Sequence, residues 1–147
     1  MLLASQFQGF CRDLHAEGVE HLIAVLAPAP ALLILVRAEF TRGRQLDRGN
    51  AQPSSLGADF GRLGLNFWDE LETHDPASVG WRNELDMLNE WRNAIAHQDF
   101  TSAKLVGIMN LRLAQVGHWR GACRRLARAM DVVMRQHLQT FTGVSPW

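Results

Sequence analysis

A chain of 147 residues has the length of one globular domain, and we expect a single domain over residues 1–147. With 47% hydrophobic and 20% charged residues, the composition is that of a folded protein and excludes a disordered chain. The formal net charge is +0, but the charges are unevenly distributed along the sequence.

The last third of the sequence is basic. Residues 101–147 contain six Arg and Lys104 against Asp131 alone, a formal charge of about +6. Arg offers a planar fork of donors that suits phosphates and carboxylates. The simpler interpretation is a solvated helix face that is satisfied by the acidic first part of the same molecule. The alternative is a surface for a polyanion.

Neither the reactive side chains nor the hydropathy indicates an exported, metal-binding or membrane protein. Cys11 and Cys123 form no CxxC pair, so we expect buried thiols in a reducing compartment. His15 and His21 lie on opposite sides of a helix, which favours a solvated face over a metal site.

The first residues lack the basic region of a secretory signal. The longest uncharged run, residues 22–36, is shorter than the roughly 18–20 residues of a membrane span, and we expect a cytoplasmic protein.

Apolar residues recur with helical spacing along most of the chain, and no segment alternates as a strand would. The first helix ends at the proline-containing segment 27–30, residues 31–41 form a second helix, and residues 43–57 are a loop. Ser54 or Ser55 is expected to cap a third helix. The inward residues of the first helix are predicted to be Phe7, Cys11, Leu14, Gly18, Leu22 and Val25, and those of the third Phe60, Leu63, Phe67 and Leu71.

Two longer helices follow. The fourth starts after Asp75-Pro76 and ends near residue 97, and the last spans roughly residues 112–142. Gly117 and Gly121 on the last helix would permit close approach of a neighbouring backbone. These elements predict an all-α bundle of four to five helices with a long C-terminal helix. Four arginines form a basic ridge on that helix, namely Arg120, Arg124, Arg125 and Arg128.

The polar residues of the fourth helix carry the strongest functional signal. Asn89, Asn93 and His97 recur at every fourth position, which predicts one stripe facing away from the apolar side. Arg92 lies beside this stripe. Arg followed five residues later by His is expected about 0.6 times by chance in this composition, and with Asn directly after the Arg on the order of 0.02 times.

The segment Arg92-Asn93-Ala94-Ile95-Ala96-His97 resembles the motif of the HEPN superfamily of helical bundles. In that motif Arg is followed after four to six residues by His, commonly with Asn directly after the Arg. The setting is also similar, because the motif ends an amphipathic helix and precedes a long final helix. The resemblance spans most of the chain as architecture, but its specific residues are Arg92, Asn93 and His97. One branch carries a Tyr two residues after the His that a partner nucleotidyltransferase modifies, and Asp99 at that place excludes such regulation here.

Many members of this superfamily are metal-independent ribonucleases, often toxins or antiviral effectors, that act as dimers with both motifs lining one cleft. The resemblance therefore implies a metal-independent endoribonuclease without a cofactor, in a toxin, defence or RNA-processing context. His97 would be the base or the acid, Arg92 would hold the phosphorane, and Asn93 would orient the His or the ribose. Because one chain supplies one such His, a homodimer would supply both groups. The expected partners are RNA, a second copy, and an antitoxin or other regulatory protein.

Other interpretations stay open. Some members keep the fold without cleavage, and a non-catalytic HEPN domain would bind RNA, a nucleotide or a protein partner through the same cleft. An antitoxin-neutralised toxin subunit would be inert until released. In purely structural terms, His97 could be an exposed residue at a helix end, and Arg92 could pair with Asp99 or near Glu90.

Overall fold

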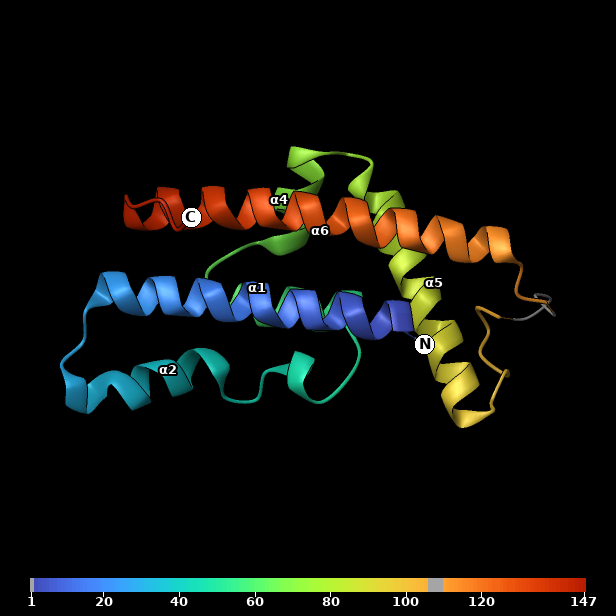
Figure 1. Ribbon diagram of the computed structural model, residues 1–147, viewed down its shortest axis with the longest axis horizontal. Helices are drawn as coiled ribbons and strands as arrows, with labels where there is room; N and C mark the ends of the chain where they lie inside the picture. The colour runs from blue at the N-terminus through green and yellow to red at the C-terminus, as the bar shows by residue number, and fades with distance from the viewer. Residues whose placement is uncertain (1, 106–109) are drawn as a thin grey trace.

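The computed structural model describes residues 2–105 and 110–147, and all regular secondary structure in these ranges is helical (Figure 1). The expected all-α bundle with a long C-terminal helix is confirmed, although it has more helices than the four to five that we predicted. None of the described helices combines the length and the apolarity needed to span a bilayer. In chain order the elements are α1 (Leu2–Leu26), the 3₁₀ turn η1 (Pro30–Leu32), α2 (Leu33–Thr41), the 3₁₀ turn η2 (Gln45–Asp47), α3 (Pro53–Gly61), α4 (Phe67–His74), α5 (Ser78–His97) and α6 (Leu113–Thr142).

The two longest helices, α1 and α6, lie side by side and run in the same direction (Figure 1). Gly18 of α1 permits a close approach, because a Cβ there would overlap the side chain of Met134 on α6. Near the ends of both helices, His21 Nε2 lies 3.1 Å from Thr142 Oγ1. The buried residues of the two helices include Phe7, Cys11, Leu14 and Leu22 of α1, and Leu126, Met130, Met134 and Leu138 of α6.

A turn divides the segment that we expected to form one third helix into α3 and α4. Gly64 lies in this turn with a φ of 77°, a conformation that favours glycine. The apolar side chains nevertheless turn inward, and the rings of Phe60 and Phe67 stack with their centroids 4.7 Å apart. The spacing thus identified the buried residues but missed the break. The expected serine cap is also wrong, because α3 begins at Pro53 without a side-chain cap.

His15 of α1 is completely buried, which contradicts the solvated face that we expected for it. Its Nε2 lies 3.1 Å from the carbonyl oxygen of Asp59, and its Nδ1 lies 3.4 Å from an Arg44 guanidinium nitrogen. Burial lowers the pKa of His15, and the Arg44 charge lowers it further. The side chain is therefore a neutral core residue that joins α1 to α3.

The helix α5 crosses α6 and carries the candidate motif at its far end. At the crossing, Gln115 Nε2 of α6 donates to Glu84 Oε2 of α5 over 2.9 Å. Beyond this point the C-terminal half of α5 projects away from α6 (Figure 1). Gln98 ends the helix in the left-handed conformation, with a φ of 53°, and its N–H donates to Ala94 O.

Candidate functional site

The three motif residues lie in the last two turns of α5 but leave the helix in different directions. Arg92 and Asn93 are half-buried, whereas His97, the last residue of α5, is exposed. Five residues along an α-helix correspond to a rotation of roughly 140°. Within one chain, Arg92 and His97 are therefore directed to different sides of α5.

Asn93 is held in place by the connection that precedes α3. Asn50 Nδ2 donates to Asn93 Oδ1 over 2.6 Å, and Arg92 Nη1 donates to the same oxygen over 3.4 Å. Asn50 is only 7% exposed, and its own Oδ1 is buried without a hydrogen-bond partner among the described residues. The carbonyl end of Asn93 is thus engaged, whereas its amide nitrogen donates to no described residue and could serve a ligand.

Asn89 does not belong to an exposed polar stripe, so that part of our expectation is wrong. It is 3% exposed, and its Nδ2 donates to the carbonyl oxygens of Ala51 and Leu85 over 2.9 Å and 3.0 Å. The side of α5 that carries Asn89 faces the connection before α3 instead of solvent. Asn89 therefore has a structural role, because it holds the segment that contains Asn50 against α5.

A shallow open pocket of about 270 Å³ lies against the end of α5. The two acidic side chains of this pocket already accept hydrogen bonds from neighbouring residues. Asp99 Oδ1 accepts hydrogen bonds from the Thr101 hydroxyl and backbone N–H, which lower the pKa of Asp99, and Glu90 Oε2 accepts from Ser102 over 2.8 Å. The His97 ring forms no hydrogen bond with a described residue. The pocket is lined by Glu90, Asn93, Ala94, His97, Asp99, Thr101 and Ser102, and thus by two of the three motif residues.

Arg92 lies outside this pocket and pairs with no carboxylate of the described residues. The pairing with Asp99 that we considered is not formed, and near Glu90 the ion pair comes instead from Lys104, whose Nζ lies 3.6 Å from Glu90 Oε1. Apart from its contact with Asn93, the Arg92 guanidinium donates to no described residue. A phosphate or carboxylate of a ligand or partner chain could accept hydrogen bonds from it.

Sequence reasoning missed Asn50, which it treated as part of a connecting loop. The residue lies 43 positions before Asn93, so no helical spacing relates the two. Its side chain is nevertheless the one that fixes the motif asparagine. No signal in the sequence distinguished Asn50 from the other asparagines.

The basic ridge on α6 is a second charged feature, separate from the motif. Its four arginines are exposed, and the ion pairs found among the described residues include none of them, so direct pairing with the acidic part of the chain is not observed. Arg125 lies over the Trp81 ring, 5.5 Å from its centroid. Nothing lies within 4 Å of a Cβ built at Gly117, and the nearest atoms to a Cβ at Gly121 belong to the Arg125 side chain. At Gly117 the described residues therefore provide no neighbouring backbone, although we expected one to approach there.

The two cysteines are buried free thiols, as expected. Burial raises the pKa of Cys11 and raises that of Cys123 to about 11, so neither is a reactive thiolate. In residues 2–105 and 110–147, no three His, Cys, Asp or Glu side chains gather as a set of metal ligands.

Comparison of the chain with family models, curated proteins and solved structures finds no match. The resemblance to the HEPN superfamily therefore stays a prediction. It rests on Arg92, Asn93 and His97 and on the helical architecture around them.

Proposed function

We propose that the protein is a metal-independent endoribonuclease that cleaves RNA through attack of the ribose 2′-hydroxyl. The observation that carries this proposal is the state of the motif side chains. His97 borders an open pocket beside Asn93 without a hydrogen bond to a described residue, and Arg92 next to them has no carboxylate partner. A ligand or a partner chain could therefore reach His97 and accept hydrogen bonds from Arg92.

The reaction needs only a base, an acid and a group that stabilises the phosphorane. A neutral His97 imidazole accepts the 2′-hydroxyl proton while the 2′-oxygen forms a bond to the adjacent phosphorus. The bond from phosphorus to the 5′-oxygen breaks, and a protonated imidazole returns a proton to that oxygen. Arg92 donates to the phosphate oxygens, and the N–H groups of Asn93 orient the ribose. The products are a 2′,3′-cyclic phosphate and a 5′-hydroxyl.

The separation of Arg92 and His97 within one chain favours a homodimer. Two copies of α5 that meet at their C-terminal ends would bring the Arg92 of one chain near the His97 of the other and supply both imidazoles. Ile95 and Phe100 support this arrangement, because they are 42% and 52% exposed beside the motif and offer apolar surface to bury. The exposed arginines of α6 would attract RNA to the dimer.

The cellular role that fits this activity is a toxin, a defence effector or an RNA-processing enzyme of the cytoplasm. An antitoxin or other regulatory protein would keep it inactive by covering the end of α5. The buried thiols Cys11 and Cys123 suit a reducing compartment.

A non-catalytic HEPN-like domain is the second candidate, and one observation favours it. Arg92 does not line the pocket that His97 borders, so a single chain does not assemble the catalytic set. In that case the end of α5 would bind RNA, a nucleotide or a protein partner without cutting a bond.

Substitution of the motif residues distinguishes the two candidates. We expect His97→Ala and Arg92→Ala to reduce RNA cleavage by about 10²–10⁴-fold while leaving the thermal transition unchanged. The matched controls are His74→Ala, at the exposed last residue of α4, and Arg82→Ala, at the Arg of the other Arg-Asn pair in α5; both should cleave like the wild type. If the wild-type protein binds RNA without cleaving it, the nuclease proposal is wrong and the non-catalytic domain is the better assignment.

A further inference from the structure

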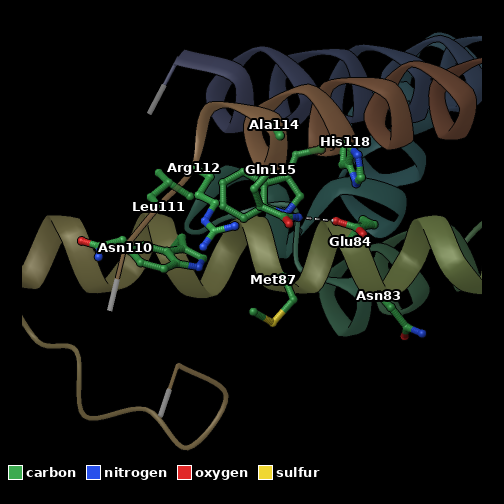
Figure 2. A pocket seen from close by; sticks show the side chains of 11 residues that line it. Asn83, Glu84, Met87, Asn110, Leu111, Arg112, Ala114, Gln115 and His118 are labelled. Atoms are coloured by element: carbon green, nitrogen blue, oxygen red, sulfur yellow. Dashed lines mark hydrogen bonds between the residues drawn. The ribbon is translucent and has the colours of Figure 1, made fainter. Parts of the chain in front are cut away.

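A larger groove lies between α5 and the first turns of α6 and contains none of the motif residues. Its volume is about 670 Å³, and Figure 2 shows side chains from both helices and from the segment just before α6 around it. The hydrogen bond from Gln115 to Glu84 spans it and joins the two helices (Figure 2). The remaining lining residues are Asn83, Met87, Trp91, Asn110, Leu111, Arg112, Ala114, His118 and Trp119.

One buried donor in this groove has no acceptor. Trp119 is 3% exposed, and its indole Nε1 has no hydrogen-bond partner among the described residues. A buried N–H without a partner is costly, and the great majority of such groups in folded proteins are paired. The Nε1 atom itself is covered, so an acceptor atom on a bound molecule would satisfy it only after a neighbouring side chain moved aside.

Four further polar side chains of the groove have no partner among the described residues: the basic Arg112 and His118, and the neutral amides Asn83 and Asn110. Arg112 is exposed. Its side chain forms no ion pair or hydrogen bond with a described residue and extends toward α5 in Figure 2. His118 is exposed and lies at the other end of the groove from Arg112 in Figure 2. Glu84, the carboxylate in the lining, already accepts the hydrogen bond from Gln115. The basic side chains without a partner therefore favour a ligand that carries a negative charge and hydrogen-bond acceptors.

The apolar part of the lining suits a flat hydrophobic body. Met87 is half-buried and Leu111 is 41% exposed, so both offer surface to a ligand, and Trp91 also belongs to the lining. Methionine sulfur and aromatic rings make favourable contacts with aromatic ligands. A mostly apolar groove with a few convergent polar groups is the usual form of a small-molecule site.

We propose that this groove binds a small aromatic anion, that is, a flat aromatic body bearing a carboxylate or a phosphate. The oxyanion accepts from Arg112 and the Trp119 indole N–H, and the ring lies against Met87 and Leu111. This site is separate from the motif and does not depend on the nuclease proposal. Trp91, which lines the groove, directly precedes Arg92, so the ligand would bind about 9 Å along α5 from His97.

The test uses the full chain with His97→Ala, so that neither RNA cleavage nor its absence affects the result. Calorimetry with naphthoate, naphthyl phosphate, neutral naphthalenemethanol, acetate and inorganic phosphate separates the contributions of ring and charge. We expect one of the two naphthyl anions to bind at least about 10-fold more tightly than the neutral alcohol and than either small anion. The tighter of the two identifies a carboxylate or a phosphate as the preferred group.

Two substitutions localise the site. Trp119→Phe removes the indole N–H but keeps an aromatic ring, and Arg112→Gln removes the exposed charge without disturbing the core; each should weaken binding of the preferred anion by about 10-fold. Arg135→Gln, at an exposed position of α6 outside the groove, should leave the affinity unchanged. If no naphthyl anion binds at millimolar concentration, if the neutral alcohol binds equally well, or if Arg112→Gln has no effect, the proposal is overturned.

Discussion

Asn50 Nδ2 donates to Asn93 Oδ1 over 2.6 Å and thereby ties the connection before α3 to the candidate motif on α5. Because this contact joins residues 43 positions apart, it couples the position of the motif to the fold of the whole bundle. A double-mutant cycle of Asn50→Ala and Asn93→Ala should give a coupling of about 0.5–1.5 kcal/mol in the free energy of unfolding, measured by urea denaturation. Strictly additive losses would show that the hydrogen bond contributes nothing.

The buried His15 predicts a loss of stability in mild acid. Burial and the Arg44 charge lower its pKa in the folded protein below the usual 6.5, so between these two values the unfolded chain binds a proton that the folded chain does not. The protonation of His15 therefore leaves the free energy of unfolding unaffected above pH 6.5 and reduces it as the pH is lowered below that value. The Asp47 carboxyl, whose pKa is lowered mainly by its hydrogen bond with Arg44, stays ionised from pH 7.5 to pH 5 and does not add to this change.

Urea unfolding at pH 7.5 and at pH 5 measures the effect of His15. The wild type should have a lower midpoint at pH 5, and His15→Gln, although less stable at pH 7.5, should lose a substantial part of that difference. An equal change with pH in the two proteins would contradict the assignment of a neutral, buried His15.

The apolar surface beside the motif predicts the oligomeric state. Light scattering at micromolar concentration should give twice the 16.5 kDa of one chain, and Ile95→Glu should give the monomer. Ile34→Glu, at a residue of α2 that is 78% exposed, serves as the control and should leave the dimer intact. A monomeric wild type, or a dimer that only Ile34→Glu disrupts, would rule out the interface at the end of α5.

The helices were largely predictable because their spacing signal is local. The last helix was expected over residues 112–142 and spans Leu113–Thr142, and the end of α5 was placed at the correct residue. The break at Gly64 was missed because the same apolar spacing continues from α3 into α4.

Burial of polar side chains was not predictable in the same way. His15 and Asn89 lie at the edges of the apolar stripes, four residues after Cys11 and Leu85, and we placed them in solvent because they are polar. Each is instead buried against a backbone carbonyl that lies 44 or 38 residues away. A carbonyl acceptor leaves no mark in the side-chain sequence, so only the tertiary fold reveals it. The motif could be recognised because its residues are close together in the sequence. Asn50, which holds Asn93 in place, could not, because its contact depends on the tertiary fold.

The products formed by the wild-type protein in the presence of EDTA test the proposed RNA cleavage most directly. One RNA oligonucleotide is compared with the same sequence carrying a single 2′-deoxy nucleotide at the cut position. We expect cleavage of the first in chelator, with a 2′,3′-cyclic phosphate on the product, and no cleavage of the second, because the attacking oxygen belongs to the ribose. Cleavage at the deoxy position, a requirement for a divalent cation, or two intact RNAs would contradict it.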